Sequence, residues 1–220
     1  MECDDALKAR IAVNLSRLEV RPAKQPNDHR YAAVALTVAD EGFGADLSGL
    51  PSFDTWQHRA AIILTRRSSR LKDHPGQWAM PGGSLDDGET AEDTALREMR
   101  EEVNLDLPAD AVLGRLDDFV TRSGFVITPV VVWGGPDLVL QRNPDEVESI
   151  HRIPVDEFLR DDAPLLESSE ASKHPVLRMP VGDSWIAAPT AAILYQFREV
   201  CVVGNDTRVA HYDQPRFAWR

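Results

Sequence analysis

The sequence predicts an α/β or α+β fold in which helices cover the faces of a mixed β-sheet. Short apolar runs rich in β-branched residues, typical of buried strands, alternate with segments whose apolar residues recur at helical spacing. The alternation is irregular and shows no internal repeat, which favours a mixed sheet over a regular βαβ series. With 220 residues, 43% of them hydrophobic, the chain is expected to form one substantial domain.

The N-terminal part of the chain contains a predicted helix, a strand and a loop. Leucine and isoleucine residues recur three or four positions apart between residues 4 and 18, which predicts an amphipathic helix. A strand is expected over residues 31–38. Residues 40–57 contain several glycine, serine and proline residues, so we expect a long loop there.

The central part contains two strands and the best-defined helix. Residues 60–65 are apolar and β-branched enough for a buried strand, and residues 78–80 are expected to form a short one that ends at Pro81-Gly82-Gly83. The next helix is expected over residues 91–103, which lack glycine and proline. Thr90 and Asp93 resemble a capping box at its start.

The C-terminal half is expected to complete the sheet. A strand is expected over residues 125–133, but Pro129 in its middle weakens this expectation, because proline cannot donate a hydrogen bond to a neighbouring strand. An acidic, serine-rich stretch at 161–173 is expected to be an exposed connection, and a closing helix follows at 190–200. The other predicted elements are strands over 111–120 and 138–141, a further segment over 146–153 and a short helix over 155–159.

Composition excludes several classes of protein. The net charge is −12, from 36 acidic and 24 basic residues, so a broad surface for nucleic acid is absent and an anionic substrate would need bound cations or a local basic patch. Cys3 and Cys201 match no metal-binding spacing. No apolar stretch has the length of a signal peptide or a membrane span. We therefore expect a soluble cytoplasmic protein with neither nucleic acid nor membrane as a partner.

Three acids on the central helix are the strongest candidates for chemistry. Glu98, Glu101 and Glu102 stand at positions i, i+3 and i+4, so their carboxylates lie on one stripe. Two unit charges about 4 Å apart repel by roughly 4 kcal/mol at an effective dielectric constant of about 20. Either their pKa values rise or a cation lies between them, and hard oxygen ligands suit Mg²⁺ or Mn²⁺. Arg97 could hold one carboxylate in position. From the helix alone, a solvated charged face is the alternative.

The residues around this helix match a known pattern. Gly83, five residues, Glu89, seven residues, Arg97-Glu98-Met99, one residue, Glu101-Glu102, one residue, Asn104-Leu105 closely resembles the Nudix box, G-x5-E-x7-R-E-U-x-E-E-x-G-U, where U is apolar. The departure is Asn104, where the family has glycine. It falls at the expected end of the helix, where the backbone tends to be left-handed and asparagine is the next most tolerated residue.

The resemblance implies a fold and a set of roles. It implies a Nudix-type α/β/α sandwich and a single Nudix hydrolase domain over 1–220, with an N-terminal helical extension (about 1–30) and a C-terminal helix and tail (about 185–220). The roles that it implies are metal binding by Glu98, Glu101 and Glu102 with a backbone carbonyl at Gly83, orientation of a carboxylate by Arg97, support by Glu89, close backbone approach at Gly82 and a helix-ending turn at Asn104.

The segment upstream of the box suggests a substrate. Residues 63–83 look like the signature of the coenzyme A pyrophosphatase subfamily, L-L-T-x-R-[SA]-x3-R-x3-G-x3-F-P-G-G. It departs at Ile63, Lys72 and Met80. Lys72 matters most, because lysine keeps the charge of arginine but lacks its planar fork. The densest basic patch of the acidic chain falls in this segment and consists of Arg66, Arg67, Arg70 and Lys72, with His74 as a further candidate. We expect this patch and Ser68 to bind phosphate groups, with a solvated basic loop as the alternative.

The resemblance therefore implies Mg²⁺-dependent (or Mn²⁺-dependent) hydrolysis of the pyrophosphate bond of a nucleoside diphosphate derivative. Coenzyme A or an acyl derivative is the first candidate, giving 3′,5′-ADP and a 4′-phosphopantetheine product. Glu146 matches a place where family members often have a further acid near the metal, so it is the candidate general base, with Glu148 in reserve. A surface-charge role for Glu146 fits its spacing equally well.

Two rival functions stay open at this point. The first is a Nudix enzyme with another substrate, namely ADP-ribose, a dinucleoside polyphosphate or a nucleoside triphosphate. A rival of another class is a Nudix-fold module that senses a nucleotide without turnover, although such modules commonly lose the box glutamates that this chain retains. The sequence does not define the oligomeric state, and a homodimer is one alternative. The aromatic and basic tail at 211–220 is expected to pack on its own domain, with a neighbouring subunit or the pocket as alternatives.

Overall fold

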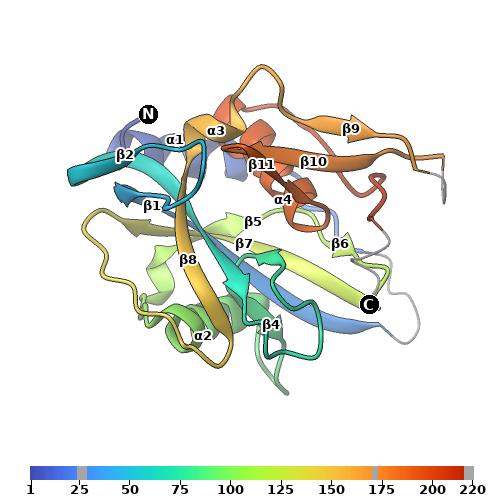
Figure 1. Cartoon of the computed structure of the whole chain (residues 1–220). Helices are drawn as coiled ribbons and strands as arrows, with labels where there is room; N and C mark the ends of the chain where they lie inside the picture. Colours follow the sequence, from blue (N-terminus) through green and yellow to red (C-terminus); the bar gives the residue numbers. More distant parts are fainter. Residues whose placement is uncertain (24–28, 170–172, 216–220) are drawn as a thin grey trace.

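The main β-sheet is mixed, as predicted. The computed structural model describes residues 1–23, 29–169 and 173–215. Within these residues the sheet has eight strands, with the central order β3-β2-β1-β7-β5. Strands β1 (Arg30–Gly44) and β7 (Phe125–Gly135) run parallel, whereas the other neighbouring pairs are antiparallel. The predicted fold class is therefore confirmed (Figure 1).

The remaining strands of this sheet extend it on both sides of β1 and β7. Strand β4 pairs with β1, β6 pairs with β7, and β8 pairs with β2. Their bounds are β2 Ser52–Arg67, β3 Trp78–Ala79, β4 Gly82–Ser84, β5 Val112–Arg115, β6 Phe119–Val120 and β8 Val147–Pro154.

Side chains that alternate along β1 divide the core into two parts. Ala33 and Ala35 pack in one buried cluster with helix α2 (Ala91–Val103). Leu36 and Val38 belong to a second cluster on the opposite face. Because successive residues of a strand point to opposite faces, this alternation places α2 on one side of the sheet and the other helices on the other (Figure 1). Those helices are α1 (Asp5–Ser16), α3 (Val155–Phe158) and α4 (Thr190–Phe197).

The predicted N-terminal and C-terminal helices are present. The Asp4 side chain caps α1 by accepting a hydrogen bond of 2.9 Å from the backbone N–H of Leu7. Helix α4 continues as a π-helical turn over Arg198–Val203, which ends at Gly204 in the left-handed conformation. No helix in the described part of the chain is long and apolar enough to cross a membrane.

A second, three-stranded antiparallel sheet was not predicted. It has the order β11-β10-β9, with β9 at Leu165–Glu167, β10 at Val176–Val181 and β11 at Ser184–Ala187. Strand β9 lies in the stretch 161–173 that we expected to be an exposed connection. The three side chains of β9 are indeed exposed, but its backbone pairs with β10. The sequence of β9, Leu-Leu-Glu, lacks the alternation of apolar and polar residues by which a strand is recognised, so the sequence did not predict it.

The prediction of a long loop over residues 40–57 is wrong. Strand β1 continues to Gly44, and β2 begins at Ser52, so a short connection joins them. Gly42 and Gly44 have positive φ angles of 63° and 104° and coincide with shifts in the β1–β2 register. These glycines form irregularities within a continuing hairpin rather than a break, because a bulge needs the backbone freedom of glycine.

The region around Pro129 shows how a central strand accommodates proline. Strand β7 continues through Pro129 without interruption. The expected strand at 111–120 is instead two short strands, β5 and β6, and Pro129 lies opposite the gap between them. Its carbonyl accepts a hydrogen bond from the Leu116 N–H at 3.0 Å. The missing N–H of proline is therefore tolerated where the neighbouring strand is itself broken.

The strand expected at residues 138–141 is also wrong. These residues form no strand. The Gln141 N–H donates to the carbonyl of Val103, and the Asn143 N–H donates to that of Glu102. Leu138 and Leu140 pack against the α2 cluster. The segment is therefore held by carbonyl groups at the end of a helix, which a helix leaves unsatisfied, rather than by a neighbouring strand.

Candidate active site

Helix α2 begins and ends where its capping residues require. The Thr90 hydroxyl accepts a hydrogen bond from the Asp93 N–H at 3.2 Å, and the Asp93 carboxylate accepts one from the Thr90 N–H at 3.0 Å. The predicted capping box is therefore confirmed. At the other end, Asn104 has the left-handed conformation, with φ 54° and ψ 39°. Met99 and Val103 are fully buried against the sheet, and Glu98 and Glu102 lie on the neighbouring stripe of the helix.

Two glycines allow the backbone before α2 to reach the glutamates. Strand β4 pairs with β1 near its start, and Gly83 lies opposite Ala33. A Cβ atom at Gly82 would lie 2.4 Å from the Ala33 carbonyl oxygen. A Cβ atom at Gly83 would lie 2.1 Å from Oε1 of Glu98. The backbone contact at Gly82 leaves no room for a side chain, and a side chain at Gly83 would displace the Glu98 carboxylate.

The structure brings together three carboxylates, of which two come from α2. Ligand oxygens of Glu98, Glu102 and Glu146 all lie within 4.8 Å of one another. Glu98 and Glu102 are buried, whereas Glu146 is exposed. Glu146 comes from the turn before β8, and its carbonyl accepts a hydrogen bond of 2.8 Å from the Ser68 N–H. Glu101, which the sequence grouped with the other two helix acids, is instead about half exposed and accepts a hydrogen bond of 3.0 Å from Arg97.

Burial and mutual repulsion disfavour the charged forms of the two buried acids. Burial, together with the nearby charges of Glu98 and Glu146, raises the pKa of Glu102 to about 8, while Arg67 opposes the shift. Burial also raises the pKa of Glu98, with Glu101 and Glu146 adding to the effect and Arg97 opposing it. A carboxylate pair of this kind is an expected feature of a site that binds a cation.

Arg97 connects the box residues into one network. Its Nη1 group donates to Glu98 at 2.7 Å and to Glu101 at 3.0 Å. Its Nε and Nη2 groups donate to the two oxygens of Glu89 at 2.8 Å and 3.1 Å. Glu89 also accepts from the Thr94 hydroxyl at 2.8 Å. These bonds hold the pKa of Glu89 down to about 2 and raise that of Arg97.

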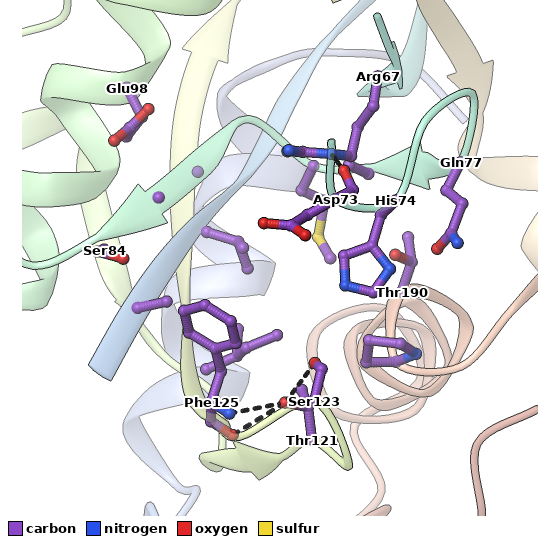
Figure 2. Close-up of a pocket in the computed structure, with 18 of the residues that line it drawn as sticks. Arg67, Asp73, His74, Gln77, Ser84, Glu98, Thr121, Ser123, Phe125 and Thr190 are labelled. Carbon is purple, nitrogen blue, oxygen red and sulfur yellow. Dashed lines mark hydrogen bonds between the residues drawn. The ribbon is translucent and has the colours of Figure 1, made fainter. Parts of the chain in front are cut away.

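The carboxylates lie in the wall of a large cavity. Its volume is about 720 Å³, which suits a nucleotide-sized ligand. In Figure 2, Glu98 and Ser84 lie on one side of the cavity, and the loop that carries Asp73 and His74 lies across from them. The turn at 121–125 and the start of α4 complete the wall.

Of the segment predicted to bind substrate, the structure places two candidates in the cavity wall. Arg67 lines the cavity, as does His74. The guanidinium of Arg66 stacks on Trp78, 3.8 Å from the ring centroid. Arg66 and the other three do not line the cavity: Ser68 is buried, Arg70 is exposed and lies 3.7 Å from Asp145, and Lys72 is exposed.

Other lining residues were not predicted from the sequence. Arg30 begins β1 and Phe125 begins β7, and the two strands pair in parallel with these residues opposite each other. Thr121, Ser123 and Thr190 also line the cavity. Arg30 and Phe125 meet only once β1 has paired with a strand almost a hundred residues away in the sequence, and Thr190 comes from α4.

The comparison with known protein families agrees with this fold. A family model described as NUDIX domain matches residues 52–174, which is more than half of the chain. The chain therefore belongs to the NUDIX domain family.

Related proteins are described as Nudix hydrolases as well. Nudix hydrolase 3 of Caenorhabditis elegans is 35% identical over 127 residues, covering 56% of this chain and 53% of the relative. NudL of Pectobacterium atrosepticum, described as an uncharacterized Nudix hydrolase, is 36% identical over 138 residues, covering 61% of this chain and 72% of the relative. The chain spans about half to two thirds of the length of the first curated relatives that it matches. Among solved structures, a MutT/nudix family protein from Enterococcus faecalis overlaps at a TM-score of 0.44 with 17% identity, covering 81% of this chain and 57% of the other.

Proposed function

We propose that this protein hydrolyses the pyrophosphate bond of a nucleoside diphosphate derivative with the help of a divalent cation. The observation that carries this proposal is the meeting of Glu98, Glu102 and Glu146 in the wall of the 720 Å³ cavity. In such a reaction water adds across the P–O–P linkage, and each of the two products keeps one phosphate of the cleaved diphosphate. Membership of the NUDIX domain family supports the same reaction class.

The residues present suit Mg²⁺ or Mn²⁺. The donors are carboxylate oxygens, which these hard cations prefer. The raised pKa values of Glu98 and Glu102 show that the buried pair carries a charge penalty, which a cation would relieve. We assign the cation to these two residues, with Glu101 at the rim and the backbone carbonyl of Gly83 as a further ligand. Such a cation neutralises charge on phosphate oxygens and makes water a better nucleophile.

The chain supplies the remaining functions. Glu146 is exposed at the same site, and we assign it as the acceptor of the proton from water, with Glu148 in reserve. Arg67 lines the cavity near Glu102 and would bind the diphosphate. Arg97 orients Glu98 and Glu101 through hydrogen bonds, as the box resemblance implies.

Coenzyme A or an acyl derivative is the substrate that we propose first, with 3′,5′-ADP and a 4′-phosphopantetheine product. The supporting observation is the segment 63–83, which resembles the coenzyme A pyrophosphatase signature. ADP-ribose is a strong rival, because the site residues just described would serve any nucleoside diphosphate derivative. Dinucleoside polyphosphates and nucleoside triphosphates are further rivals.

A panel assay tests this proposal. The purified chain is incubated with Mg²⁺ and, in separate reactions, with coenzyme A, acetyl-coenzyme A, ADP-ribose, a dinucleoside polyphosphate and nucleoside triphosphates, and the products are separated by chromatography. We expect the highest kcat/KM with coenzyme A or its acyl derivative and none in excess chelator. A higher value for ADP-ribose would replace the substrate but keep the reaction. Binding of a nucleotide without turnover of any compound would instead favour a sensing module.

A further inference from the structure

A second cationic group lines the cavity away from the acids. The guanidinium of Arg30 lies over the ring of Phe125, 4.1 Å from its centroid, and both residues line the cavity. Stacking on an aromatic face holds a guanidinium flat and leaves the N–H groups at its edge free to donate. No carboxylate in the described part of the chain forms an ion pair with Arg30, so these donors are available to a ligand.

The strand register separates Arg30 from the acids. Gly83, whose backbone adjoins the Glu98 carboxylate, lies opposite Ala33 on β1. Arg30 precedes Ala33 by three residues, so it lies about 10 Å further along the strand. Arg67, the other arginine in the cavity wall, is near enough to Glu102 to oppose the rise in its pKa. The two arginines therefore lie at different positions in the cavity wall.

Hydroxyl groups accompany Arg30. The Arg30 N–H donates to the Gly124 carbonyl at 3.0 Å, which ties the 121–125 turn to the start of β1. Ser123 and Thr121 line the cavity from this turn, with their hydroxyl oxygens 3.1 Å apart (Figure 2). The Thr121 hydroxyl is also bonded to the backbone of Phe125. Ser123 is therefore the hydroxyl better placed to donate to a ligand beside Arg30.

We propose that Arg30, supported by Phe125 and accompanied by Ser123, binds a phosphate monoester of the substrate that is separate from the diphosphate being cleaved. A planar guanidinium with a neighbouring hydroxyl matches the several oxygens of a phosphate. The inference rests on the proposed function and deepens it. It makes Arg30 the residue that selects nucleotides with an additional ribose phosphate, such as coenzyme A, over 3′-dephospho-coenzyme A and ADP-ribose, which lack it.

A substrate pair that differs by this phosphate tests the inference. kcat/KM is measured for coenzyme A and 3′-dephospho-coenzyme A with the wild-type chain and with Arg30→Gln. We expect Arg30→Gln to lower the value for coenzyme A by roughly tenfold or more, the usual effect of losing a hydrogen bond to a charged group. The value for 3′-dephospho-coenzyme A should stay unchanged. An equal loss for both substrates, or no loss for either, would overturn the inference.

Two further measurements keep this test separate from that of the proposed function. Arg10→Gln, on the exposed side of α1, is the matched control for loss of a positive charge and should leave both values unchanged. If the wild-type chain cleaves no form of coenzyme A, the substrate proposal fails, and calorimetric binding of 3′,5′-ADP and 5′-AMP in Mg²⁺ decides on Arg30. A preference for 3′,5′-ADP that disappears in Arg30→Gln supports the inference, and any other result overturns it.

Discussion

Arg97 binds both carboxylate oxygens of Glu89, with Nε 2.8 Å from Oε1 and Nη2 3.1 Å from Oε2. The same guanidinium reaches Glu98 and Glu101 with its remaining nitrogen. Glu89 therefore fixes the plane of Arg97, and Arg97 in turn orients an acid of the candidate metal site. A planar fork can do this and a single ammonium group cannot.

Replacement of Arg97 by lysine should separate charge from geometry. Arg97→Lys keeps one positive charge but cannot bind Glu89 and Glu98 together in the same arrangement. We expect kcat/KM to fall by about tenfold to a hundredfold, as for other groups that orient metal ligands. Arg100→Lys, at an exposed position of the same helix, is the control and should change activity little. Equal activity in the two variants would contradict the orienting role of Arg97.

The stability that Glu89 provides should depend on pH. Its pKa is about 2 in the folded chain, against an ordinary value of 4.5, mainly because of Arg97. Its contribution is therefore complete above pH 4.5 and is lost as the pH falls toward 2. In thermal unfolding, Glu89→Gln should lower Tm at pH 7, and the difference from wild type should shrink between pH 4.5 and 2. Asp106→Asn, at an exposed position, is the control. A Tm difference that is independent of pH would contradict this account.

The contribution of Glu102 to stability should have the opposite pH dependence when divalent cations are removed. Its pKa of about 8 lies above its ordinary value of 4.5, mainly because of burial. The unfolded chain therefore loses this proton first, and the stability of the folded chain falls as the pH rises from 4.5 to 8. In a chelator at pH 8, Glu102→Gln should have a higher Tm than wild type. Added Mg²⁺ should raise the Tm of wild type more than that of the variant, and equal shifts would remove Glu102 from the metal site.

A single methyl group at Gly83 should displace a candidate ligand. Its Cβ would lie 2.1 Å from Oε1 of Glu98, so the carboxylate must move. We expect Gly83→Ala to lower activity by tenfold or more, again as for a disturbed metal ligand. The control is Gly88→Ala, where φ is +87° and no atom lies within 4 Å. It should lower stability by roughly 1 kcal/mol through backbone strain and leave activity nearly intact. Comparable loss of activity in both would show that strain alone is responsible.

Much of the central helix could be predicted because its determinants are local. Thr90 and Asp93 form the capping box within a single turn, and Asn104 ends the helix through its own backbone preference. Glu98 and Glu102 are one turn apart, so helical geometry alone brings them together. The mistakes in the sheet have the opposite origin. Gly42 and Gly44 look like loop residues in sequence but form irregularities in a strand, because pairing with β2 compensates for their weak preference.

The sequence by itself determined the class of fold, the position of α2 and the two acids that α2 presents side by side, since these depend on contacts within a few residues. Only the tertiary structure decided that Glu146 joins them rather than Glu101. It likewise decided that Arg30 faces Phe125, through the parallel pairing of β1 and β7. Such pairings are selected by the burial of whole sheet faces, and that free energy is not contained in any single stretch of sequence.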